Sequence, residues 1–155
     1  MPEADARPVR ALLVPLQGGR MLLLPNAAVA EVVALRDLVP AADDAPDWQL
    51  GTMPWRGLAL PAVSYEALRG EPATAPGPGA QVIVLNSLGE ALAVGYYGLV
   101  AAGIPHLMAV GDGMVQATAA PGEGGYALCD LLLGESRASI PDLDAIEAQV
   151  VAAGD

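Results

Sequence analysis

Glycine and proline punctuate this chain from end to end, which limits how long any single helix or strand can be. The 155 residues include 18 glycines and 14 prolines, and most apolar runs between them are short. Short apolar runs bounded by turn residues are typical of β-strands. The pattern therefore predicts a mainly β fold built as a small barrel, with two or three short helices.

The first part of the chain predicts a β-hairpin. Residues 10–16 and 21–24 are apolar runs, and the turn-forming sequence Gln17-Gly18-Gly19-Arg20 joins them. Residues 1–9 mix charged and small residues and are expected to form a disordered arm. Because charged residues precede any apolar run, this arm does not resemble a signal peptide.

A short helix is predicted after the hairpin. Asn26 follows a proline and can cap a helix that runs through Val33. Val29, Val32 and Val33 are spaced three to four apart or adjacent, so in a helix they would lie on one face.

The stretch from Gly51 to Leu68 predicts two short strands joined by a turn and followed by a helical segment that Ser64 can cap. Pro54 restricts its own φ and Gly57 permits a positive φ, which places the turn between the two strands. Trp55 and Arg56 are then held at a turn, where partner-binding residues often lie. The alternative is that Arg56 is merely solvated and Trp55 is a hydrophobic lid.

A Pro-, Gly- and Ala-rich segment at residues 69–79 predicts an exposed linker near the middle of the chain. After it the pattern restarts, because residues 81–95 align without a gap to residues 11–25. Both segments read as strand, glycine turn and strand, which favours two similar small β units.

The last third predicts further strands and a C-terminal helix. Residues 107–110 and 114–118 flank Gly111-Asp112-Gly113, a strong hairpin signal, and residues 126–133 form another strand-like run. Ser139 is the expected cap of the helix. Its apolar face would consist of Ile140, Leu143, Ile146 and Val150.

Charge narrows the range of partners. Seven basic and 18 acidic residues give a net charge of −11. An acidic surface repels phosphate, so we expect no nucleic-acid or anionic-membrane partner, whereas basic protein surfaces are favoured. The lone Cys129 cannot form an internal disulfide, which fits a reducing, cytoplasmic compartment.

One segment has the length of a membrane span. Residues 91–111 contain no Asp, Glu, Arg or Lys. Three glycines, Pro105 and His106 interrupt it, and no arginine cluster at either end would set an orientation. We therefore expect no direct membrane insertion.

No enzyme motif is present in the sequence. The single histidine and single cysteine cannot alone build a tetrahedral metal site, so we expect no metal and no cofactor. The one catalytic alternative joins Cys129 to His106 and an acid such as Asp130. Leucines flank Cys129 on both sides, which favours a buried and inert thiol, and we predict that the chain is not an enzyme.

The order of motifs resembles the CheW-like domain of bacterial chemosensory systems. Val29-Ala30-Glu31-Val32 is similar to that family's V-x-E-V/I segment, and residues 51–63 are similar to its G-V-x-N-L-R-G-x-x-x-P-V-V-D-L hallmark. Residues 82–100 resemble the family's later strand pair, and residues 128–132 resemble its closing L-L-D segment. The resemblance covers residues 10–133.

Three departures from the family pattern are visible. Ser64 and Leu99 stand where the family has aspartates, and Trp55 replaces a leucine. Together with the added C-terminal helix, they make the chain look more like the divergent ChpC- and PilI-like adaptors of type IV pilus systems.

The resemblance implies a non-catalytic adaptor made of two five-stranded SH3-like barrels packed together, with short helices and a C-terminal helix. It divides the chain into a CheW-like domain at residues 10–135, made of two intertwined subdomains, and a helix and tail at residues 136–155. Such adaptors bridge the regulatory domain of a CheA-type histidine kinase and the cytoplasmic tip of a chemoreceptor. The implied partner-binding residues are Val29, Glu31, Val32, Trp55, Arg56 and Gly57.

Alternatives remain at this point. The two valines can be core residues and Arg56 an internal brace. The chain can also be a small β-barrel interaction module of an unrelated pathway or, less favoured, a cysteine-dependent enzyme.

Overall fold

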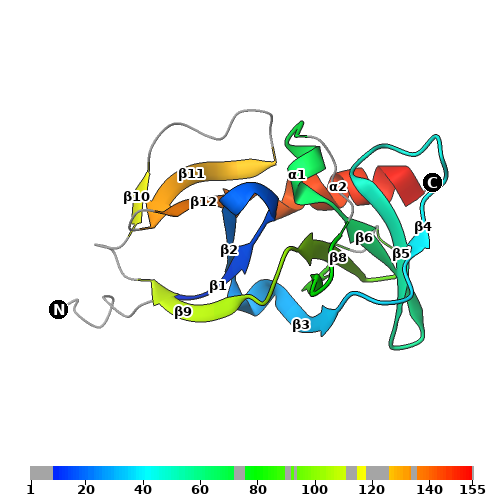
Figure 1. The fold of residues 1–155 in the computed structure, drawn as a ribbon, viewed down its shortest axis with the longest axis horizontal. Coiled ribbons are helices and arrows are strands. Elements are labelled where there is room, and N and C mark those ends of the chain that lie inside the picture. The colour runs from blue at the N-terminus through cyan, green and yellow to red at the C-terminus, as the bar shows by residue number, and fades with distance from the viewer. Residues whose placement is uncertain are drawn as a thin grey trace.

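The computed structural model describes residues 9–71, 76–89, 92, 94–110, 115–117, 126–133 and 136–154. Two β-sheets make up most of it (Figure 1), with strand orders β10-β11-β12-β2-β1-β9 and β3-β7-β8-β6-β5-β4. We name them sheet A and sheet B. The predicted mainly β class is confirmed, although each sheet has six strands in the described residues where five were expected.

Sheet A joins the two ends of the chain, and sheet B is built from its middle. The strands of sheet A are β1 (Val9–Pro15), β2 (Met21–Pro25), β9 (His106–Val110), β10 (Val115–Ala117), β11 (Ala127–Leu133) and β12 (Ser136–Pro141). Those of sheet B are β3 (Val29–Ala34), β4 (Val39–Pro40), β5 (Gln49–Trp55), β6 (Leu58–Val63), β7 (Gln81–Asn86) and β8 (Tyr96–Ala101). The helical segments are η2 (Gln17–Gly19), η3 (Asn26–Ala28), α1 (Tyr65–Leu68) and α2 (Leu143–Gly154).

The predicted first hairpin is confirmed, and the predicted helix after it is wrong. β1 and β2 pair antiparallel around the turn at η2. Only Asn26–Ala28 is helical, as a single 3-10 turn, and Val29–Ala34 forms strand β3 against β7. β-Branched valines fit a pleated strand better than a helix, and the pairing with β7 decides between them.

The restart of the pattern at residue 81 was only partly right. β7 and β8 do form an antiparallel pair, but the second strand begins at Tyr96, and Leu92 lies in the connection instead of in a strand. Both strands lie inside sheet B beside β3 and β6. The segment at residues 69–79 therefore does not separate one sheet from the other.

Two predictions for the last third of the chain were wrong in detail. β9 pairs with β1 and β10 with β11, so these strands do not form the predicted hairpin in the described residues, and Gly111-Asp112-Gly113 lies outside them. Ser139 belongs to β12 and caps no helix. Asp142 caps α2 instead, because its Oδ1 accepts the Ala145 N–H at 3.2 Å.

Residues 91–111 are not a helix where the structure describes them. They contribute β8 and β9 to different sheets. Within the described residues, no helix combines the length and the apolar composition that crossing a membrane requires.

One hydrophobic core is shared by both sheets. Side chains of β1 and β2 meet those of β7 and β8, and α2 adds Leu143, Ile146 and Val150 of its predicted apolar face to the same cluster. The fourth predicted residue, Ile140, lies in β12 and packs in another cluster. Fully buried large side chains of this core include Leu22, Leu24, Ile83, Leu85, Leu99 and Ile146. A second cluster lies within sheet B around Met53, Trp55 and Leu60.

Tyr97 places a hydroxyl group in this shared core. The side chain is fully buried, and its Oη has no hydrogen-bond partner among the described residues. Burial, together with the nearby carboxylates of Glu147 and Asp144, raises the pKa of the phenol well above its ordinary value. The hydroxyl group therefore stays neutral, and no hydrogen bond from the described residues offsets the free energy of removing it from water.

We expect Tyr97→Phe to raise the free energy of unfolding by about 1 kcal/mol, because it removes an unpaired polar group and keeps the ring. Urea denaturation followed by circular dichroism measures the change. A loss of stability would show that the hydroxyl group makes a favourable bond in solution.

Candidate functional site

The predicted turn between β5 and β6 is confirmed and is tighter than the sequence indicated. Arg56 and Gly57 form the two-residue loop, with φ values of 50° and 78°. Two adjacent residues with positive φ define the hairpin turn whose twist matches that of the flanking strands. Pro54 and Trp55 belong to β5 itself. Arg56 is one of three non-glycine residues with positive φ in the described residues.

Glu31 connects this turn to strand β3. Its Oε1 accepts the Trp55 indole N–H at 3.0 Å and the Arg56 guanidinium at 3.1 Å. The Arg56 guanidinium also lies 5.0 Å from the centroid of the Trp55 ring, within cation–π range. The carboxylate of Glu31 thus orients both Trp55 and Arg56.

The connection is possible because sheet B curves and β3 carries a bulge. β3 stands at one end of the strand order and β5 near the other, so their contact requires the sheet to curl. The β3–β7 register shifts between Val29 and Glu31. A bulge changes the direction of the side chains after it, and here it precedes the residue that reaches the turn.

Exposure separates the roles of these side chains. The Arg56 side chain is 68% exposed and that of Glu31 is 38% exposed, whereas Trp55 is only 7% exposed. Trp55 packs edge-on against Tyr96, with ring centroids 4.8 Å apart, in the second hydrophobic cluster. Trp55 therefore supports the turn from beneath, and Arg56 is the residue presented to solvent.

Val29 and Val32 do not join the cluster around Arg56. Both are half-buried and pack against the core shared by the two sheets. Of the six residues singled out from the sequence, the structure brings together Glu31, Trp55, Arg56 and Gly57. The two valines share a strand with Glu31.

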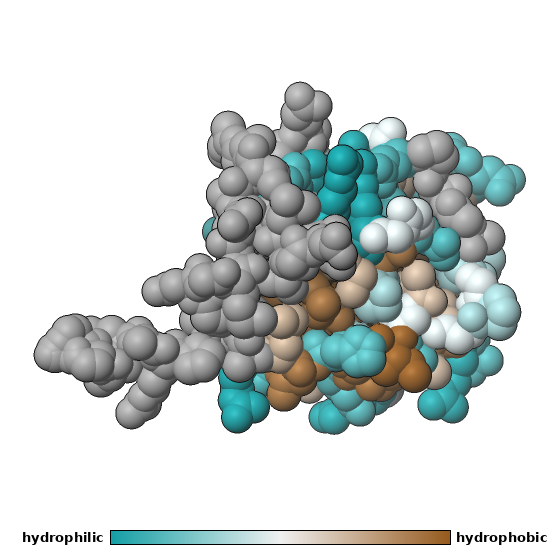
Figure 2. Space-filling view, turned by 60° about the vertical axis from the view of Figure 1, so that its left-hand side comes forward, coloured by the Kyte–Doolittle hydropathy of each residue, from teal (hydrophilic) through white to brown (hydrophobic). Residues whose placement is uncertain are grey.

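Sequence reasoning did not single out the exposed apolar residues near β9. Ile104 and Leu107 are among the four large exposed hydrophobic residues found in the described part of the chain. Both lie where β8 turns into β9, at the β1 side of sheet A. Figure 2 shows apolar residues near the lower edge of the face that it presents, with polar residues between them.

Two departures noted in the sequence, Ser64 in the hallmark stretch and Leu99 in the second half, serve structural purposes in this chain. Ser64 Oγ accepts the Ala67 N–H at 3.2 Å and so caps α1, as predicted. Leu99 lies in β8 and is buried in the shared core. A serine can replace aspartate as a helix cap, whereas a buried leucine carries no charge.

The positions of the candidate catalytic residues do not favour the alternative of cysteine catalysis. Cys129 lies on β11 and His106 on β9, with three strands between them in sheet A, and Asp130 is engaged by Arg69 and Ser139. The side chain of Cys129 is outside the described set. Among the described residues, no three His, Cys, Asp or Glu side chains are grouped as metal ligands.

Comparison with known proteins identifies a family and a solved structure of similar fold. The family model described as the CheW-like domain matches residues 10–148. No curated protein sequence matches the chain. Among solved structures, the scaffolding protein TtCheW from Thermoanaerobacter tengcongensis superposes with a TM-score of 0.70 at 14% identity, covering 88% of this chain and 85% of that one. At this identity the superposition establishes the fold.

Proposed function

Because the chain belongs to the CheW-like domain family, we propose that it is a non-catalytic adaptor linking a chemoreceptor to a CheA-type histidine kinase. A scaffold role in chemotaxis signalling follows from the family itself. The particular partners, and the residues that contact them, are our proposal for this chain. We place it in the cytoplasm, where both partners would meet it.

The observation that carries the proposal is the exposed guanidinium of Arg56. Glu31 and the Trp55 ring hold it in one orientation on a tight turn. A charged group that is already oriented loses little conformational entropy when it binds. Its planar donors suit a carboxylate on the partner, with which they form charge-assisted hydrogen bonds.

Apolar contacts would supply the rest of the interface. Val29 and Val32 on β3 are half-buried, and Ile104 and Leu107 near β9 are exposed. We propose that the apolar face of the helical hairpin at the receptor tip lies against these residues, because amphipathic helices bind apolar surfaces in this way. Gly57 keeps the tip of the turn free of a side chain beside Arg56.

We extend the proposal to type IV pilus signalling. Its support is the pair of departures from the family pattern at Ser64 and Leu99. Leu99 is buried where the family pattern has its second aspartate, so this chain lacks that charge. An adaptor with this change would serve a different set of partners from the principal flagellar one.

Replacing Arg56 by alanine tests the proposed interface. We expect affinity for the receptor's cytoplasmic fragment to fall by about tenfold or more, as is usual for an anchoring arginine. The fold should survive, because an ion pair this exposed adds little to stability. Isothermal titration calorimetry against purified receptor and kinase fragments measures each affinity separately.

Arg36→Ala is the matched control, since Arg36 is also an exposed arginine and lies between β3 and β4 of sheet B. Equal binding by both variants would remove Arg56 from the interface. Unfolding of the Arg56 variant would make Arg56 an internal brace. If neither fragment binds the folded wild-type chain, an interaction module of another pathway becomes the better explanation.

A further inference from the structure

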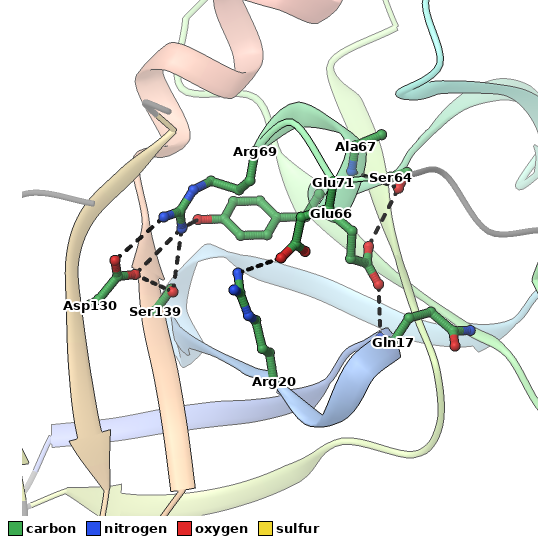
Figure 3. Close-up of polar contacts among 10 residues, drawn as sticks. Gln17, Arg20, Ser64, Glu66, Ala67, Arg69, Glu71, Asp130 and Ser139 are labelled. Atoms are coloured by element: carbon green, nitrogen blue, oxygen red, sulfur yellow. Dashed lines mark hydrogen bonds and ion pairs between the residues drawn. The ribbon is translucent and has the colours of Figure 1, made fainter. Parts of the chain in front are cut away.

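The short helix α1 and the three residues after it send their polar side chains to sheet A, although α1 follows directly from sheet B. Glu66 accepts the Gln17 N–H at 2.9 Å, and Glu71 pairs with Arg20 at 2.8 Å. Both partners lie at the turn between β1 and β2, as Figure 3 shows. The hydroxyl of Tyr65 donates to the Tyr126 carbonyl, just before β11, at 3.0 Å.

Arg69 is the centre of this set. Its side chain is only 8% exposed, although the sequence placed it at the start of an exposed linker. The guanidinium donates to the Tyr65 hydroxyl at 3.2 Å, to Asp130 on β11 at 3.4 Å and to Ser139 on β12 at 3.5 Å. Figure 3 shows Arg69 directed toward Asp130 and Ser139.

Asp130 is held in its charged form. Ser139 Oγ donates to Asp130 Oδ1 at 2.6 Å, in addition to the contacts from Arg69. Partial burial opposes ionisation, but the hydrogen bonds from Ser139 and Arg69 outweigh it and lower the pKa of the carboxyl below its ordinary value. The ion pair is therefore intact at neutral pH.

The second helix makes the reverse connection. α2 follows sheet A, and Glu147 on it binds the loop after β7 in sheet B. Its carboxylate accepts the Leu88 N–H at 2.6 Å, the Ser87 hydroxyl at 2.7 Å and the Gly89 N–H at 3.2 Å. Each sheet is thus tied to the other by a helix that begins after one of its own strands.

These ties differ in kind from the core between the sheets. Apolar packing in the shared core supplies stability, but the hydrophobic effect itself is not directional. Hydrogen bonds with charged groups weaken steeply when their angles change. The polar contacts therefore add directional constraints between the sheets, and those of Arg69 reach two strands of sheet A at once.

We propose that Arg69 is a positioning residue that locks the orientation of sheet A relative to sheet B. The effect on binding rests on the proposed function, in which the partner surface includes β3 of sheet B and the start of β9 on sheet A. A receptor would contact both strands together only when the two sheets lie at the correct angle. Arg69 itself contacts no partner in this scheme.

Distance measurement between the sheets tests the proposal directly. Spin labels at Arg137→Cys on β12 and Ala59→Cys on β6, two exposed positions, report the separation in a Cys129→Ala background. With Arg69 intact we expect one narrow distance distribution. Arg69→Ala should widen it by about twofold, because the sheets then sample several angles around the same core.

Arg36→Ala in the same labelled chain is the control and should leave the distribution narrow. An unchanged distribution in the folded Arg69→Ala chain overturns the proposal. If Arg69→Ala does not fold, Asp130→Ala removes the ion-pair partner of Arg69 on β11, and an unchanged narrow distribution in that folded variant would overturn the proposal.

Receptor binding separates this inference from the proposed function. Where the fragment binds wild type, Arg69→Ala should weaken binding several-fold while Arg36→Ala does not. A widened distribution without weaker binding would leave the lock in place and remove its role in partner binding. If no receptor binds the wild type, the distance measurement still decides the lock.

Discussion

Replacing Ile83 by alanine should lower the free energy of unfolding by about 3 to 4 kcal/mol, the largest effect we expect from a side-chain truncation in this protein. Ile83 is completely buried in β7, where it lies opposite Val32 on β3 and Leu99 on β8. It belongs to the core that both sheets share. The cavity left behind would lie between neighbours that paired strands hold in place, so little of it can collapse.

Ile104→Ala makes the same chemical change at a site that is 69% exposed. We expect a loss of no more than about 0.5 kcal/mol there, since an exposed isoleucine leaves no cavity. Urea denaturation of both variants measures the difference. Similar losses in the two would mean that the core between the sheets contributes little to stability.

The sequence predicted the parts of this fold that local residues determine. The β1–β2 hairpin and the turn at Arg56-Gly57 follow from glycines whose positive φ a turn requires. The cap of α1 by Ser64 is also local. In each case a few adjacent residues carry the whole signal.

Prediction failed where a distant strand decides the outcome. Val29, Val32 and Val33 have helical spacing, but β7 pairs with them and makes a strand. The same holds for β9 and β10, because strong turn residues lie between them and yet each pairs with a different strand. Local turn chemistry does not indicate which strands will meet.

The candidate site could be predicted only in part, again because distant residues complete it. Arg56 stands out because a turn presents it, but its contact with Glu31 depends on the curl of sheet B and on a bulge in β3. Arg69 was missed because proline and glycine follow it and resemble a linker. Its burial depends on Asp130 and Ser139, which lie 61 and 70 residues away.

Gly51, the first residue of the hallmark stretch, explains why the motif begins with glycine. Its φ is +143°, and an added Cβ would overlap the backbone carbonyl oxygen of Val39 on the neighbouring strand β4. The clash is with backbone, so no side-chain rotation can relieve it. A register shift between Gln49 and Gly51 in the β5–β6 pairing accompanies the unusual φ.

Gly51→Ala should therefore cost about 3 kcal/mol, combining backbone strain with the displacement of β4. Gly19→Ala is the matched control, because Gly19 also has a positive φ of 82° but no atom within 4 Å of the added Cβ. That variant should lose only about 1 kcal/mol, the strain alone. Chemical denaturation gives both values, and amide exchange in β4 and β5 locates the damage. Equal losses in the two variants would mean that glycine is needed at residue 51 only for its positive φ. A larger loss for Gly51→Ala, as we expect, would mean that the missing side chain also allows β4 to approach β5.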